Sequence, residues 1–140
     1  MAIGILGRRT PPYGLDPLCL IYSMISEMTK KALNSLKHSK KTEEFYERLM
    51  TPGLLGEVQP AEAMCDLVEN EYIKRLLRNA SDSYIRFALS TGRHKEEIKE
   101  ERNKLTEFLK NEELKKAEKA LDAYFKLLAK AVNEERGMNE

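Results

Sequence analysis

Apolar side chains recur every three or four residues along most of this 140-residue chain, and this spacing is the feature that most restricts its fold. Such a period places apolar residues on one face of an α-helix, whereas a half-buried strand needs strict alternation of apolar and polar residues. No stretch of the sequence sustains that alternation. We therefore expect an all-α protein, a helical bundle of four to five helices with an extended N-terminal arm.

The first helical pattern begins at Asp16 and Pro17, where a carboxylate can cap the helix and a proline fits its first position. Its apolar face comprises Leu18, Ile21, Tyr22, Ile25, Met28, Ala32, Leu33 and Leu36. Residues 42–50 follow as a short helix or as a bent continuation of the first. The segment TPGLLGEVQP, residues 51–60, contains two prolines and two glycines and predicts a break.

The longest helical pattern begins at Pro60 and reaches residue 89 or 90, where Gly92 is the expected stop. Its expected apolar face comprises Met64, Leu67, Val68, Ile73, Leu76, Leu77, Ala80, Tyr84, Phe87 and Ala88. Four poor helix formers, Asn79, Ser81, Asp82 and Ser83, allow an interruption at residues 79–83.

Residues 95–135 carry the last helical pattern, as one helix or as two. Residues 95–110 are highly charged with few apolar anchors, and Asn111 with the two glutamates after it can cap a following helix. That helix would place Leu114, Ala117, Leu121, Tyr124, Leu128 and Val132 on one seam, and Gly137 would end it. We therefore divide the chain into an extended N-terminal arm (1–15), a single helical domain (16–136) and a tail (137–140).

The sequence has no recognisable catalytic, phosphate-binding or metal-binding motif. Its two histidines, His38 and His94, lie far from both cysteines in sequence and show no metal-ligand spacing, so we expect no metal, no other cofactor and no enzymatic activity. Cys19 and Cys65 fall within helical patterns and indicate buried free thiols, with one bridge between two helices as the alternative. The enrichment in Lys and Glu is seen in hyperthermophile proteins and equally in proteins with long helices.

Charge is unevenly distributed along the chain, although the net charge is only +1. Residues 1–42 contain seven basic and two acidic residues, whereas the rest contains 17 basic and 21 acidic residues. Basic residues gather on one side of each of two expected helices, and the arm adds a pair. We predict that these side chains contact nucleic-acid phosphates: Arg8, Arg9, Lys30, Lys37, Lys41, Lys74, Arg75, Arg78, Arg86 and Arg93.

A second interpretation explains the same basic stripes without nucleic acid. Eight glutamates lie within residues 96–118, and they could neutralise the basic residues within one chain or between neighbouring copies. The basic stripes would then be ordinary solvated faces.

The organisation of the chain resembles that of the coat proteins of archaeal filamentous viruses. The resemblance lies in the proline-containing arm, in DPLCLIYSMISEMTKKALNSLK (16–37), in YIKRLLRNASDSYIR (72–86) and in the helical tail of mixed charge. It implies a helical nucleoprotein filament in which the arm and helices wrap DNA, with copies of the chain or a paralogous subunit as partners. It also implies location in a virion. The cytoplasm is the other expected location, because the sequence lacks a signal peptide and any apolar run long enough to span a membrane.

We therefore predict a non-enzymatic structural protein that self-assembles along nucleic acid, as a filament or capsid subunit. DNA is the favoured partner, through backbone contacts, although the sequence does not separate DNA from RNA or duplex from single strand. The alternative is a small helical adaptor subunit of a larger protein or ribonucleoprotein complex. Residues 51–60 and the C-terminal seam would then carry the contacts.

Overall fold

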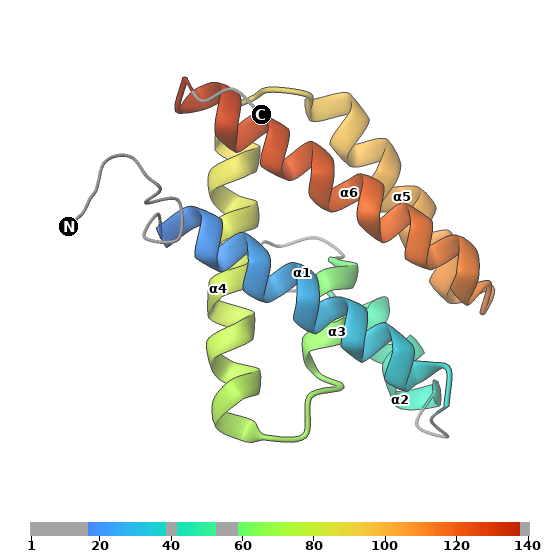
Figure 1. Ribbon diagram of the computed structural model, residues 1–140. Helices are drawn as coiled ribbons and strands as arrows, with labels where there is room; N and C mark the ends of the chain where they lie inside the picture. The colour runs from blue at the N-terminus through green and yellow to red at the C-terminus, as the bar shows by residue number, and fades with distance from the viewer. Residues whose placement is uncertain (1–16, 39–41, 53–58, 138–140) are drawn as a thin grey trace.

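The computed structural model describes residues 17–38, 42–52 and 59–137 of the chain. Six helices lie within these ranges: α1 (Pro17–Leu36), α2 (Thr42–Leu49), α3 (Pro60–Cys65), α4 (Glu71–Ser90), α5 (Lys95–Lys110) and α6 (Leu114–Glu135) (Figure 1). The described residues include no strand, so the all-α expectation is confirmed for them, but six helices replace the expected four to five. The arm, the capping residue Asp16 and residues 138–140 of the expected tail lie outside the described ranges.

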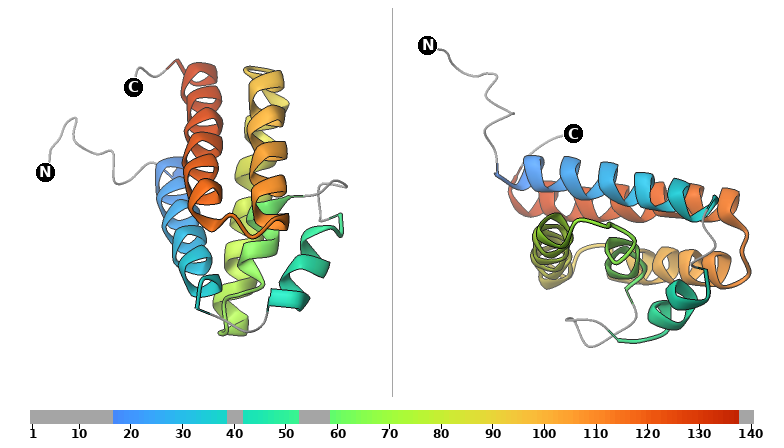
Figure 2. Two further views of the ribbon diagram at one scale, coloured as in Figure 1. Left: turned by 90° about the vertical axis from the view of Figure 1, so that its right-hand side faces the viewer. Right: turned by 90° about the horizontal axis from the view of Figure 1, so that it is seen from below.

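The helices pack in two layers, as Figure 2 shows. α1 and α6 lie side by side in one layer, and α3, α4 and α5 lie in the other, with α2 on the outer side of this second layer, against α3 and α5. α5 and α6 form a hairpin with the most extensive contact of any helix pair. α1 crosses α4, and the first half of α4 extends beyond this crossing (Figure 1). That half is therefore covered by few neighbouring helices.

One hydrophobic core lies between the two layers and draws on every helix. Its fully buried side chains include Ile25 and Leu33 of α1, Leu77 and Ile85 of α4, and Leu121 of α6. Each such side chain contributes about 1.5–3 kcal/mol through removal from water. All six residues of α3 are buried, whereas each of the other helices keeps one side exposed. None of the described helices is long and apolar enough to cross a membrane.

The helix is interrupted between α3 and α4, where the sequence predicted a single long helix. Asn70 caps α4, because its Oδ1 accepts a hydrogen bond of 3.1 Å from the backbone N–H of Ile73. The interruption allowed at residues 79–83 does not occur. Ser81 is buried against α3, 3.8 Å from the sulfur of Cys65, and Asp82 pairs with Arg86 one turn later. Both polar residues therefore have partners within a continuous helix.

Residues 95–135 form two helices, joined by a tight turn at residues 111–113. Glu112 adopts a left-handed conformation with φ of 58°, and the N–H of Glu113 donates to the carbonyl of Phe108 over 2.8 Å. Asn111 therefore ends α5 and does not cap α6, whose N-cap is Glu113.

Both cysteines are free, so the expected free thiols are confirmed and the alternative bridge is not formed. Cys65 is buried, whereas Cys19 is partly buried. Burial raises the pKa of the Cys65 thiol to about 12, and this thiol donates to the carbonyl of Ala61 over 3.2 Å.

Candidate functional site

The predicted basic residues of α1 reach across to α6. Lys30 Nζ lies 2.7 Å from Asp122 Oδ1, and Lys37 Nζ lies 3.2 Å from Glu118 Oε1. The hydrogen bond to Asp122 raises the pKa of Lys30, because it stabilises the ammonium form. Pairing with acids of the same chain, the second interpretation of the sequence, is thus observed for both lysines, while Lys41 lies outside the described residues.

Four of the predicted basic residues lie on α4, and together with its acidic residues they form one side of the helix. We call this side the charged face of α4; it comprises Glu71, Lys74, Arg75, Arg78, Asp82 and Arg86. Three of its bases have acidic partners: Lys74 pairs with Glu71 at 3.2 Å, Arg78 with Asp66 at 3.8 Å, and Arg86 with Asp82 at 3.2 Å.

Arg75 differs from the other bases of the charged face. It is exposed and forms no ion pair with any residue that the structure describes. It lines a shallow hollow of about 260 Å³ together with Lys74, Arg78, Asn79 and Glu71. Three bases, one acid and one amide therefore line this open depression.

Arg93 does not extend the charged face, contrary to the expectation based on a straight helix. α4 ends at Ser90, and Gly92, with φ of 72°, turns the chain away. Arg93 instead lies against the end of α6, with its Nε 3.2 Å from Glu135 Oε1. The structure thus places the seven described bases in three groups: Lys30 and Lys37 at the α1–α6 seam, four residues on α4, and Arg93 at the α4–α5 turn. Arg8 and Arg9 lie outside the described residues.

His94 follows Arg93 and joins the same turn to α5 and α6. Its Nε2 lies 2.7 Å from Glu134 Oε1, and its Nδ1 lies 3.3 Å from Glu97 Oε1. These carboxylates raise the pKa of His94, chiefly through the hydrogen bond to Glu134. This cluster stabilises the turn and lies apart from the charged face of α4.

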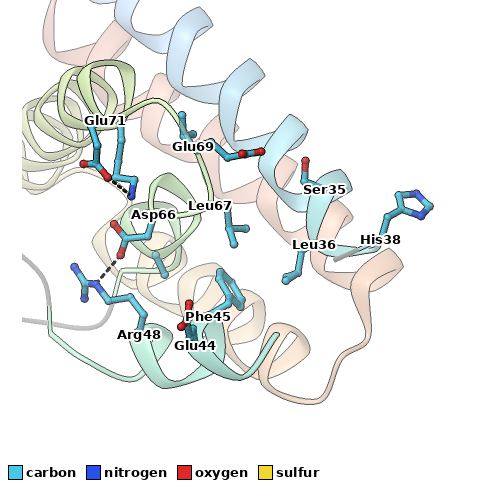
Figure 3. A pocket seen from close by; sticks show the side chains of 13 residues that line it. Ser35, Leu36, His38, Glu44, Phe45, Arg48, Asp66, Leu67, Glu69 and Glu71 are labelled. Carbon is cyan, nitrogen blue, oxygen red and sulfur yellow. Dashed lines mark hydrogen bonds and ion pairs between the residues drawn. The ribbon is translucent and has the colours of Figure 1, made fainter. Parts of the chain in front are cut away.

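A larger hollow, of about 840 Å³, lies between the end of α1, α2, α3 and residues 66–71 (Figure 3). Its acidic lining residues are Glu44, Asp66, Glu69 and Glu71, against the bases Arg48 and Lys74 and the histidine His38. Within it, Arg48 Nε lies 2.7 Å from Asp66 Oδ2, as the dashed line in Figure 3 shows. Its excess of carboxylates does not suit phosphate binding. This larger hollow therefore adds nothing to the predicted nucleic-acid contacts.

α4 also has a face that the sequence interpretation missed. One side of the helix carries only uncharged residues, and we call it the uncharged face: Tyr72, Ile73, Leu76, Asn79, Ala80, Ser83, Phe87 and Ser90. Its first half is open to solvent, with 71% of Tyr72, 42% of Ile73 and 47% of Leu76 exposed. The sequence had assigned Ile73 and Leu76 to the core. The available signal was the width of the apolar arc of α4, which exceeds what one buried face needs.

The described residues contain no group of three or more His, Cys, Asp or Glu side chains placed to hold a metal ion. Comparison of the chain with models of known protein families, with curated proteins and with solved structures found no match. Function is therefore inferred from the two solvent-facing sides of α4.

Proposed function

We propose that the protein is a non-enzymatic structural subunit that assembles with copies of itself, and that α4 carries the contacts. The observation that supports this is the open half of the uncharged face, where Tyr72, Ile73 and Leu76 adjoin one another in solvent. Single exposed apolar side chains are common, but a contiguous group of large ones is typical of an interaction surface. Tyrosine is moreover among the residues that most often anchor protein interfaces.

Self-assembly can be tested by size-exclusion chromatography with light scattering on the full chain over a series of concentrations. We expect the mass to rise with concentration for the native chain and to stay monomeric for the double variant Ile73→Gln, Leu76→Gln. The matched control is Met50→Gln, which changes an exposed apolar residue beyond the end of α2 and should associate like the native chain. A native chain that remains monomeric throughout, or a double variant that associates normally, would contradict the proposal.

We propose nucleic acid as a second partner, bound through the charged face of α4. The supporting observation is Arg75, an exposed cation with no acidic partner among the described residues, beside Lys74 and Arg78 at the same hollow. Bases in ion pairs must give up those pairs to bind phosphate, whereas Arg75 need not. Such contacts favour a nucleic-acid backbone of any sequence and weaken with salt.

Fluorescence anisotropy with labelled duplex DNA at low and moderate salt tests this contact. Arg75→Glu should weaken binding several-fold and reduce the dependence of log affinity on log salt by about 1 or more. Lys126→Glu makes the same change of charge at an exposed position of α6 and should have a smaller effect. Absence of binding at low salt, or equal loss in the two variants, would remove nucleic acid from the proposal.

A nucleoprotein filament, which the resemblance to coat proteins of archaeal filamentous viruses implies, would combine both contacts of α4, and it stays a prediction. The alternative is an adaptor that binds a different protein. The C-terminal seam expected to carry its contacts is buried in the core, for example at Leu121 and Leu128, and most of residues 51–60 lies outside the described ranges. Among the described residues, the exposed face of α4 would take their place. The adaptor alternative predicts a monomeric chain in the light-scattering experiment.

A further inference from the structure

We infer that the uncharged face of α4 pairs with the same face of a second copy, so that two α4 helices pack antiparallel about a twofold axis. This rests on the proposed self-assembly and specifies its surface and geometry. A twofold contact uses the same patch on both partners, so the patch must be complementary to itself.

The composition of the uncharged face meets this requirement. It carries no carboxylate, ammonium or guanidinium group that would have to leave water. The neighbouring charged face, by contrast, could be buried only by desolvating its arginines and lysines. Pairing through the uncharged face leaves the charged face outside the contact, except for Arg86 at its rim.

The order of side-chain sizes along the face defines a register. The large residues Ile73 and Leu76 lie in the first half, and the small residues Ala80 and Ser83 follow at the same helical spacing. In an antiparallel pair, Leu76 can lie opposite Ala80 of the second copy while Ile73 lies opposite Ser83. Each large side chain then meets a small one, which lets the helices approach closely.

The charges at the two ends of α4 also favour an antiparallel arrangement of the two helices. Glu69 and Glu71 lie at its start, and Arg86 lies near its end. In this register Arg86 lies opposite residue 70 of the second copy, between the two glutamates. Its guanidinium, which pairs with Asp82 at 3.2 Å, would have to be shared with Glu69 of the second copy. Glu69 is exposed and forms no ion pair with any residue in the described ranges, so it can accept this contact. A parallel pair would instead bring like charges together at both ends.

The expected affinity is modest. Specific interfaces bury about 1,200–2,000 Å² in total, and one helix pair of about 30 Å length supplies less than that. We therefore expect a dimer that dissociates on dilution.

Disulfide trapping tests the direction and the register. Two variants are made in a Cys19→Ser background, one with Ile73→Cys and the other with Ser83→Cys. One of them carries a tag, so that the mixed dimer differs in size from dimers of either variant alone. The two are mixed with oxidised glutathione, which is the electron acceptor. We expect the mixed dimer to form in the mixture and to be lost when Met50→Cys replaces either partner. Bridging of each variant only to itself would indicate a parallel pair and overturn the inference.

A charge exchange provides a second test. Glu69→Lys should weaken self-association, and Arg86→Glu in the same chain should restore it, whereas Glu107→Lys on α5 should leave association unchanged. Absence of rescue overturns the inferred contact between Arg86 and Glu69.

If the native chain associates in light scattering yet forms no bridge between residues 73 and 83, the inference fails and the proposed self-assembly stands. If the native chain is monomeric, both fail.

Discussion

Tyr124 of α6 donates its hydroxyl hydrogen to Oε1 of Gln59 over 2.8 Å, in the interior of the bundle. Both side chains are buried, and Gln59 is the residue from which α3 starts. Nε2 of the same amide is buried without a hydrogen-bond partner in the part of the chain that the structure describes. The bond with Tyr124 thus satisfies one half of a buried polar group and fixes the start of α3 against α6.

Tyr124→Phe should lower the free energy of unfolding by about 1–3 kcal/mol, because it leaves the Gln59 oxygen buried without this donor. Urea unfolding followed by circular dichroism measures the change. Tyr72→Phe removes the same hydroxyl from an exposed ring and should change stability by no more than about 0.5 kcal/mol. Equal effects in the two variants would contradict the assigned role of the buried bond.

Leu121→Ala and Leu76→Ala remove the same atoms from two different environments. Leu121 is fully buried, whereas 47% of Leu76 is exposed. The first variant should cost about 2–5 kcal/mol of unfolding free energy, and the second clearly less. Urea unfolding should be measured at concentrations where the chain is monomeric. A large loss in Leu76→Ala would mean that this residue belongs to the core, as the sequence had indicated.

The ion pair between Lys30 and Asp122 should stabilise the fold only weakly. Their side chains are 46% and 44% exposed, so water and salt screen the attraction. A double-mutant cycle with Lys30→Ala and Asp122→Ala should give a coupling energy below about 1 kcal/mol that decreases with added salt. Coupling that persists in high salt would indicate a more buried seam between α1 and α6.

His94 should make stability depend on pH. Its carboxylate partners raise its pKa in the folded state above the ordinary value of about 6.5. The stabilisation from the protonated ring is therefore fully present below about pH 6.5 and is lost as pH rises through the higher folded pKa. The difference in unfolding free energy between the native chain and His94→Gln should decrease over that window. An NMR titration that gives His94 a pKa below 6.5 would contradict this sign.

The two thiols should differ in reactivity. Cys65 is buried with a pKa of about 12, so almost none of it is thiolate at pH 8. Cys19 is only partly buried. Ellman's reagent should therefore titrate one thiol in the folded protein and two in denaturant, and Cys19→Ser should remove the fast reaction. Rapid reaction of Cys65 in the folded Cys19→Ser variant would show that its site opens readily.

The helices could largely be predicted from the sequence, because apolar spacing reports directly which residues share a helix face. Ile25, Leu33 and Leu36 of α1, and Leu121 and Leu128 of α6, are buried as expected. The position of the break was wrong, since Ser81 and Asp82 looked like helix breakers. Their partners, Cys65 and Arg86, become apparent only when the packing is known. Asn70 followed by an acidic first turn was the local signal for the true start of α4.

The charged surfaces were less predictable, for a physical reason. Helical spacing shows that Lys30 and Lys37 share a side of α1, but it does not show which element that side meets. Their partners, Asp122 and Glu118, lie more than 80 residues away in the chain. The width of the apolar arc of α4 indicates that part of it stays exposed, but the exposure of Ile73 in particular depends on where α1 crosses α4, which no local pattern encodes.

Asp66 accepts an ion pair from Arg48 of α2 on one carboxylate oxygen, at 2.7 Å, and from Arg78 of α4 on the other, at 3.8 Å. Because one carboxylate serves two helices, a phosphate bound to Arg78, as we propose for nucleic acid, would compete with Asp66 for the same guanidinium. The ion pair between Asp66 and Arg48 would then be free to shorten or to shift. Under this proposal, binding at α4 would be thermodynamically linked to the packing of α2, which would not touch the phosphate.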